Sequence, residues 1–327
     1  MNRSARVVAL VVLAGLLLVL VCVDIGRGEF TVPVGRVLDV FAGGGTRSER
    51  FVIMDVRLPR VLVGMLAGAA LGIAGALTQS TLRNPLASPD ILGMTAGASA
   101  AAVAVLVFDA TVAVPLAAVL GGLSTAFLIY MFAWRKGFDG FRLVLIGVAA
   151  NAMLLAVINW LMVYAEIEDV ARAQIWLNGS LDAADWSQLW WLAGGFVVAG
   201  GLALWSAPTI AVLRFGDDKA RSLGVRLQLR QGLVVLAAVV LASLATAATG
   251  PIAFVALAAP QIAKRVLRCP IEPVVASAAV GSILVIGGDV VARTVLPVAL
   301  PVGVVTAAVG GVLLLYLLAQ TNRKVSV

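Results

Sequence analysis

Apolar runs dominate the chain, and most are long enough to cross a lipid bilayer as a helix. A bilayer core about 30 Å thick requires roughly 20 apolar residues, since a helix rises about 1.5 Å per residue. A further run at 252–263 is too short to cross without support from neighbouring protein. The full-length runs are residues 7–23, 61–82, 91–108, 112–133, 143–164, 189–210, 232–249, 274–291 and 302–319. This pattern predicts an all-α fold, a polytopic bundle of transmembrane helices.

The composition narrows the class of protein further. Hydrophobic residues make up 61% of the 327 and charged residues only 13%, which excludes a water-soluble globular enzyme and a disordered chain. The chain has no histidine, and Cys22 and Cys269 lie far apart without metal-ligand or redox spacing. We therefore expect neither a resident metal nor a cofactor. The sequence also contains no cluster of catalytic groups that would indicate an integral membrane enzyme.

Basic residues are distributed unevenly between the predicted loops. Loops rich in Lys and Arg stay on the cytoplasmic side of the membrane. The 24 Lys and Arg residues therefore indicate the topology of the chain rather than binding to nucleic acid. If 252–263 crosses the membrane, 16 of the 24 lie inside and the other 8 outside; if it does not, the division is 12 to 12. The asymmetry favours about ten spans with both termini in the cytoplasm.

The interiors of the spans contain little that could carry a proton or an ion. The first seven full-length runs have no Asp, Glu, Lys or Arg, which disfavours a proton-driven carrier working alone. Gly64, Gly68 and Gly72 are four residues apart and share one helix face. This spacing is typical of close helix packing, and a direct part in a translocation path is the alternative.

Two predicted cytoplasmic loops have a defined local pattern. Between the second and third spans, Pro85 and Pro89 break the helix, which gives either a simple turn or a short rigid constriction at the mouth of the bundle. The loop at 207–231 contains a pattern typical of a short exposed helix, either a connector or a docking element for a soluble partner. Outside, the segment 165–188 is typical of an amphipathic interfacial helix.

The order and spacing of several motifs resemble the ten-helix permeases of type II ABC importers, which carry ferric siderophores, haem or cobalamin. The resemblance runs from about Arg57 to the C-terminus. It rests on Arg57-Leu58-Pro59-Arg60, Asn84-Pro85-Leu86-Ala87-Ser88-Pro89-Asp90, Gly250-Pro251-Ile252-Ala253-Phe254-Val255, Asp289 with Arg293, and Leu300-Pro301-Val302-Gly303. Within this family the chain is most similar to the second permease subunit of ferric enterobactin importers, through Phe138-Asp139-Gly140-Phe141-Arg142-Leu143, Trp176-Leu177-Asn178-Gly179-Ser180-Leu181 and Gly216-Asp217-Asp218. Gln261 and Ala299 replace the family's usual histidine and glutamate, so no imidazole or carboxylate role transfers to them.

The resemblance implies a single transmembrane permease domain over 1–327, in the cytoplasmic (inner) membrane, that imports a ferric siderophore of the catecholate type. It implies as partners a paralogous permease or a second copy, two ATPase subunits and an extracytoplasmic binding protein. The chain lacks a Gly-x-x-x-x-Gly-Lys-Ser/Thr loop, so we expect no hydrolysis by the chain itself and assign ATP and Mg to the partner ATPase. The alternatives are haem or cobalamin as substrate, or a stand-alone secondary carrier.

The resemblance also implies roles for particular residues. Arg57, Arg60 and Arg293 match docking arginines for the binding protein; the alternative is local pairing of Arg57 with Asp55 and of Arg293 with Asp289, four residues earlier on a helix. Asn84, Pro85 and Leu86 would form the cytoplasmic gate. The residues that would couple the permease to the ATPase, within the loop 207–231, are Asp217, Asp218, Ala220, Leu223 and Gly224.

Overall fold

The computed structural model describes residues 3–28, 31–134, 140–213, 220, 222, 227–296 and 298–325. Every run predicted to span the membrane contains a helix. The helices in chain order are α1 (Arg3–Gly26), α2 (Val34–Phe41), α3 (Arg47–Arg50), a π-helix (Phe51–Arg57), α4 (Leu58–Leu82), a 3₁₀ turn (Pro89–Leu92), α5 (Met94–Val107), α6 (Val114–Ala133), α7 (Gly140–Tyr164), α8 (Ile167–Leu177), α9 (Trp186–Leu213), α11 (Leu227–Thr249), α12 (Val255–Val266), α13 (Val274–Thr294) and α14 (Val302–Val325). Among the described residues, seven helices are long and apolar enough to cross a membrane, and α5 and the first part of α14 are shorter apolar helices.

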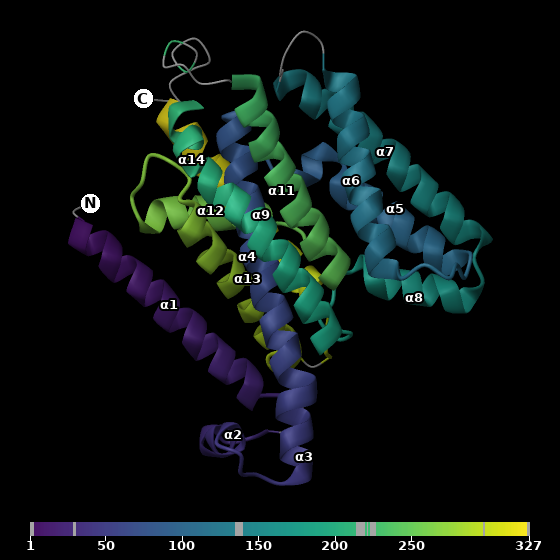
Figure 1. Ribbon diagram of the computed structural model, residues 1–327, viewed down its shortest axis with the longest axis vertical. Coiled ribbons are helices and arrows are strands. Elements are labelled where there is room, and N and C mark those ends of the chain that lie inside the picture. The colour runs from purple at the N-terminus through teal and green to yellow at the C-terminus, as the bar shows by residue number, and fades with distance from the viewer. Residues whose placement is uncertain are drawn as a thin grey trace.

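Helix α4 forms the centre of the bundle (Figure 1). Its glycines allow α13 to cross it at backbone distance: a Cβ at Gly68 would lie 2.5 Å from the Gly281 carbonyl oxygen, and one at Gly72 would lie 2.1 Å from that of Ser277. A Cβ at Gly75 would lie 1.7 Å from the carbonyl oxygen of Ala256, at the start of α12. The packing interpretation of the glycine stripe is therefore confirmed.

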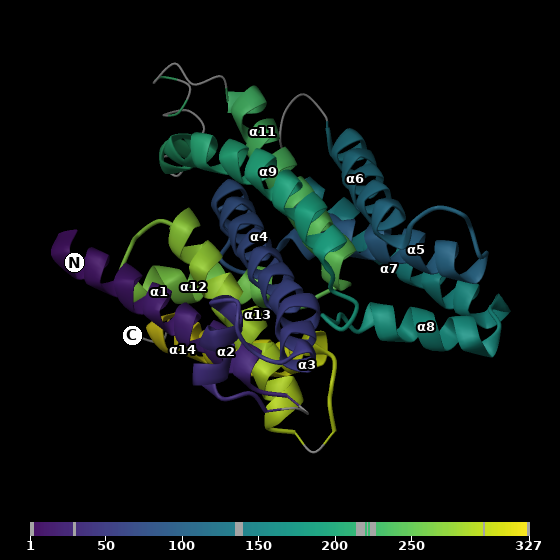
Figure 2. The same cartoon turned by 60° about the horizontal axis from the view of Figure 1, so that its bottom comes forward.

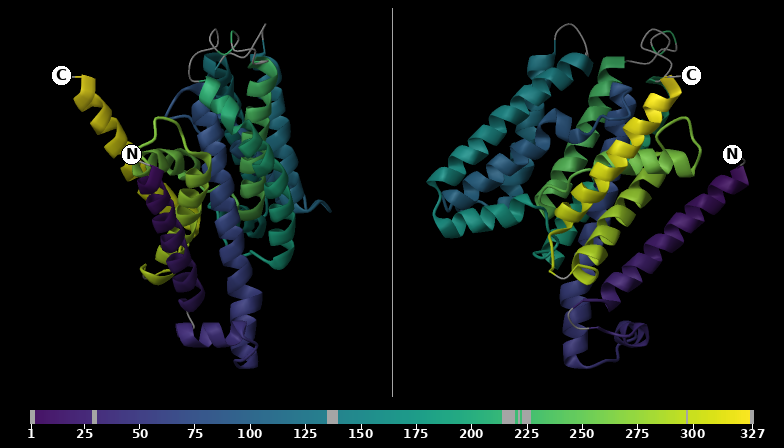
Figure 3. Two further views of the ribbon diagram at one scale, coloured as in Figure 1. Left: turned by 60° about the vertical axis from the view of Figure 1, so that its left-hand side comes forward. Right: turned by 180° about the vertical axis from the view of Figure 1, so that it is seen from behind.

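Helices α9 and α11 pack directly against α4, and two further groups of helices lie on either side of it (Figure 2). Helices α5, α6, α7 and α8 lie on one side, and α1, α12, α13 and α14 lie on the other. Helix α1 lies at the periphery and contacts the bundle mainly along α13. Both termini lie toward the end of the bundle opposite α2 and α3 (Figure 3), as an even number of crossings requires.

The structure corrects several predicted boundaries. The third span begins at Met94 rather than at residue 91, because Gly93 adopts a left-handed conformation that separates α5 from the preceding 3₁₀ turn. The loop expected at 207–231 is shorter, because α9 continues past Pro208 to Leu213 and α11 begins at Leu227. Helices α2 and α3 were not predicted, and α3 continues through the π-helix into α4.

Candidate functional site

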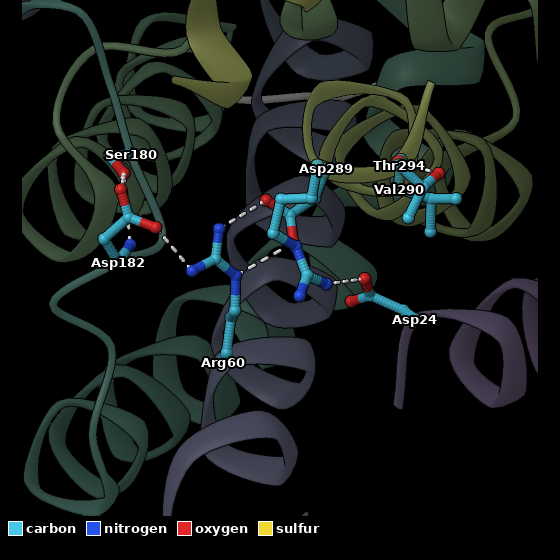
Figure 4. Close-up of polar contacts among 8 residues, drawn as sticks. Asp24, Arg60, Ser180, Asp182, Asp289, Val290 and Thr294 are labelled. Carbon is cyan, nitrogen blue, oxygen red and sulfur yellow. Dashed lines mark hydrogen bonds and ion pairs between the residues drawn. The ribbon is translucent and has the colours of Figure 1, made fainter. Parts of the chain in front are cut away.

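A cluster of mostly buried charges joins α1, α4, α13 and the segment after α8 (Figure 4). It lies where α1 ends and α4 begins, at the α2–α3 end of the bundle, which is the predicted extracytoplasmic end (Figure 1). Arg60, at the start of α4, donates from Nε and Nη2 to the two carboxylate oxygens of Asp289 on α13, at 2.9 and 2.8 Å. Its Nη1 donates to Asp182, in the segment after α8, at 2.5 Å. The Arg60 guanidinium thus connects α4, α13 and the segment after α8, through a bidentate contact with Asp289 and a single contact with Asp182.

Arg293 extends the cluster to α1. Its Nε donates to Asp289 at 3.0 Å, and its Nη2 pairs with Asp24 in the last turn of α1. Arg57 Nη1 donates to the carbonyl oxygen of Ile25 at 2.6 Å. Asp24 and Asp289 are fully buried. Since removing one partner leaves an uncompensated buried charge, these contacts fix α1, α4 and α13 relative to one another.

The segment after α8 is held to the cluster by its acidic residue. Burial alone would raise the pKa of Asp182, but hydrogen bonds from Arg60 and Ser180 and the charges of Arg60 and Arg293 hold that pKa below its usual range. Ser180 Oγ donates to Asp182 at 2.8 Å. Asp182 therefore stays ionised near neutral pH.

The three arginines that the resemblance assigns to docking all take part in this cluster. Arg57 is buried, and the side chains of Arg60 and Arg293 are only 13% and 16% exposed. The local pairing of Arg293 with Asp289 is confirmed. Docking of a binding protein on Arg57, Arg60 and Arg293 stays a prediction, and it would have to act on arginines that are already engaged within the chain.

At the opposite end, α4 closes with the turn that carries the predicted gate. Arg83 is left-handed, and Asn84 Oδ1 accepts a hydrogen bond from the Leu86 amide at 2.9 Å, so the turn is stabilised by its own asparagine. Asn84, Pro85 and Leu86 are all exposed. The predicted break in the helix is confirmed, whereas the gating role is a prediction that this geometry permits.

A partly buried ion pair adjoins this turn. Lys264 Nζ, at the end of α12, donates to Glu272 at 2.6 Å, and Ser80 Oγ of α4 donates to the other carboxylate oxygen at 2.9 Å. Burial alone would raise the pKa of Glu272. The hydrogen bonds from Lys264, from the Glu272 backbone and from Ser80, together with the charge of Lys264, hold that pKa below its ordinary value. A cavity of about 220 Å³ opens between this pair and the turn, lined by Gln79, Ser80, Arg83, Asn84, Pro85, Lys264 and Glu272.

Gln261, the residue that departs from the family pattern, has a defined place on α12. Its Nε2 donates to Gln79 Oε1 at 2.6 Å, and Gln79 Nε2 donates to the Leu257 carbonyl at 3.0 Å. Both side chains are buried. The two side-chain amides satisfy each other's hydrogen-bonding groups where α4 crosses the short helix α12. Such contacts with neighbouring protein support a segment that is too short to span the membrane alone.

The predicted coupling residues Asp217, Asp218, Leu223 and Gly224 lie outside the described residues. Ala220 is described; it is helical and buried, and it packs against Val212 of α9. Its methyl group is therefore not presented at the surface as a contact for a partner. The coupling role of the segment stays a prediction.

Sequence reasoning did not assign the acidic partners of the cluster at Asp24 and Asp182, nor the Lys264–Glu272 pair. Their partners are remote in sequence; Ser80 and Glu272, for example, are 192 residues apart. The only available signal was a charged residue directly beside an apolar run. Among the described residues, no group of three or more His, Cys, Asp or Glu side chains is arranged to hold a metal ion.

Seven long apolar helices, glycine crossings in the interior of the bundle, and ion pairs that lie near its two ends within the described part of the chain are typical of a multi-pass membrane protein. The chain belongs to the FecCD transport family, whose model matches residues 16–320.

Relatives and a solved structure agree with this assignment. The chain is 40% identical to the ferric enterobactin transport system permease protein FepG of Escherichia coli (strain K12), over 94% of this chain and 96% of that protein. It is 34% identical to FepD, another ferric enterobactin transport system permease protein of the same organism, over 99% of each chain. A solved structure described as an inward-facing, metal-chelate type ABC transporter matches with a TM-score of 0.84 over 96% of this chain and 99% of that one; at 24% identity this likeness shows the fold.

Proposed function

We propose that the chain is a permease subunit of an ATP-driven importer that moves a ferric siderophore of the catecholate type across the cytoplasmic membrane. The observation that carries this proposal is the 40% identity to the enterobactin permease FepG, which extends over nearly the full length of both chains. The chain forms part of the translocation path and transmits the movement of the ATPase subunits to the bundle. ATP and its Mg are bound by the partner ATPase subunits.

In this proposal the two ends of the bundle have different roles. An extracytoplasmic binding protein delivers the ligand at the α2–α3 end, where Arg57, Arg60 and Arg293 lie. Closure of the ATPase subunits acts on the segment that contains Asp217 and Leu223, and shifts the bundle between outward-open and inward-open states. Asn84, Pro85 and Leu86 close the cytoplasmic mouth. A paralogous permease completes the path, as FepG and FepD suggest by both being permeases of ferric enterobactin transport.

Uptake of radiolabelled iron tests the substrate class. Cells that lack their own siderophore permeases would express this chain with its ATPase, binding protein and second permease. We expect import of iron as a ferric tris-catecholate, and at least tenfold slower import as a ferric tris-hydroxamate, because the two chelates differ in charge. Preferred uptake of the hydroxamate, of haem or of cobalamin would contradict the catecholate assignment and keep the importer class.

A substitution in the coupling segment tests the importer class itself. Leu223→Asp would place a charge in the apolar contact proposed with the ATPase, at a cost of several kcal/mol if the charge is unpaired. We expect loss of ATPase copurification and of ligand-stimulated hydrolysis. Ser222→Asp is the matched control, because it adds the same charge one position earlier at an exposed side chain. If the Leu223→Asp variant kept both ATPase copurification and ligand-stimulated hydrolysis, the segment would be only a connector.

A further inference from the structure

A groove opens where the chain leaves α1. It has a volume of about 700 Å³ and lies between the last turns of α1 and the segment that leads into α2. Leu18, Val19, Val23 and Arg27 line it on the α1 side, and Val32 lines it on the other. The second wall is held by the Val32 amide, which donates to the Gly26 carbonyl at 3.0 Å. The groove is thus a built feature with two sides rather than the open face of one helix.

The two ends of the groove differ in chemistry. On α1, Leu18 and Val19 are 64% and 57% exposed, and with Val23 they form a continuous apolar wall. Asp24 and Ile25 face the other way and are buried against the bundle. Beyond the end of the helix, the exposed side chain of Arg27 forms no hydrogen bond or ion pair within the described part of the chain. An apolar channel that ends at an unpaired cation fits an amphipathic anion.

The depth of the groove in the membrane identifies that anion. Helix α1 is one of the apolar spans, and Arg27 directly follows it. Leu18, Val19 and Val23 therefore lie at the level of the acyl chains, and Arg27 lies at the level of the phosphates. We propose that this groove binds one anionic phospholipid, with an acyl chain along Leu18–Val23 and its phosphate on Arg27. The bound lipid fills the space between α1 and the α2 segment and steadies the entry to α2.

Photocrosslinking in the intact transporter complex tests the proposal. The complex would be placed in nanodiscs that contain phosphatidylglycerol with a photoreactive acyl chain, and the crosslinked peptides would be mapped. We expect labelling concentrated at residues 18–23, reduced about fivefold by Arg27→Gln, since one arginine near anionic headgroups contributes about 1 kcal/mol. Arg47→Gln is the matched control, because it removes an exposed arginine at the same end of the molecule and should leave labelling unchanged.

A second variant separates the groove from general lipid contact. Val19→Trp fills the apolar wall and keeps Arg27; it should lower labelling at residues 18–23 and leave labelling of the exposed residues Val8, Val11 and Val12 unchanged. Labelling that is equal along the exposed face of α1 and insensitive to Arg27→Gln would overturn the proposal and identify ordinary boundary lipid. Crosslinks from this groove to the second permease, obtained with a photoreactive residue at Leu18, would also overturn it, because the occupant would then be protein.

Discussion

Asp289 is the residue on which two arginines converge, from α4 and from its own helix. Asp289→Asn would keep the shape of the side chain but leave Arg60 and Arg293 with one fewer counter-charge in a buried setting. We expect a loss of about 3–5 kcal/mol in the free energy of unfolding. Thermal unfolding of the purified protein in detergent measures it.

The control for Asp289→Asn is Asp39→Asn. Asp39 pairs with Arg36 at 3.5 Å, but its side chain is 47% exposed, so its removal should cost less than about 1 kcal/mol. Equal unfolding temperatures for the two variants would show that the cluster contributes nothing beyond a surface pair.

Glu272 provides a pH dependence at the other end. Its pKa in the folded protein lies below the ordinary value of 4.5, so its stabilising contribution is complete above that value and is lost as the pH falls through the folded-state pKa. We expect Glu272→Gln to destabilise the protein by about 2 kcal/mol at pH 7, and the difference from the unsubstituted protein to shrink steadily below about pH 4.5.

Unfolding temperatures at a series of pH values measure this difference. Glu168→Gln, at an exposed position on α8, is the control and should change the unfolding temperature at pH 7 by less than Glu272→Gln does. A difference between Glu272→Gln and the unsubstituted protein that stays constant from pH 7 to pH 4 would mean that the Lys264–Glu272 pair stabilises the fold through packing and not through its charge.

Residue-scale prediction from the sequence succeeded for one of the two local pairings, because Arg57 donates to the Ile25 carbonyl and no ion pair with Asp55 is found among the described residues. Asp289 and Arg293 are four apart on one helix, so their pairing followed from helical geometry. Arg60 and Asp289 are 229 residues apart, and Gln79 and Gln261 are 182 apart. Nothing local specifies such pairs, because they depend on which helices cross and at what depth.

At the scale of elements, the crossing of α4 and α13 depends on glycine. Gly72→Ala would place a Cβ 2.1 Å from a backbone carbonyl of α13, which cannot rotate away. The helices would have to separate, at a cost of about 1–3 kcal/mol or more for overpacking. The expected result is a lower unfolding temperature and a smaller yield of folded protein in the membrane.

Gly201→Ala on α9 is the control, because a Cβ there would meet no atom within 4 Å. It should be neutral or slightly stabilising, since alanine favours a helix more than glycine does by up to about 1 kcal/mol. Similar effects of the two substitutions would mean that the α4–α13 crossing can relax and that the glycine stripe does not set the distance between these helices.

The sequence predicted all the long helices because apolar length is a strong signal, and it was least accurate where that signal ends. Helix α9 continues to Leu213 beyond the apolar run, and the 3₁₀ turn at Pro89–Leu92 lies where the third span was expected to begin. Helix α2 was missed because eight residues are too few to span a bilayer. Its buried positions, Val37 and Val40, become visible only when α1 and the π-helix lie beside it.

At the scale of the whole molecule, the even number of crossings was predicted from charge alone. The short apolar run at 252–263 decides whether the number is even. In the structure this run packs against α4 at Gly75 and is linked to it by the Gln79–Gln261 hydrogen bond. Both termini accordingly lie toward one end of the bundle, away from α2 and α3 (Figure 3). Which end faces the cytoplasm follows from the division of 16 basic residues against 8.

Cysteine accessibility tests this orientation. With Cys22 and Cys269 replaced by serine, single cysteines at Ser222 and Ser180 should react from opposite sides of the membrane, because Ser222 lies between α9 and α11 and Ser180 lies beside Asp182 at the α2–α3 end. In intact cells a membrane-impermeant maleimide should label Ser180→Cys strongly and Ser222→Cys only after the cells are opened. Labelling of Ser222→Cys in intact cells, with Ser180→Cys protected, would invert the topology and would place the proposed coupling segment on the side of the membrane that has no ATP.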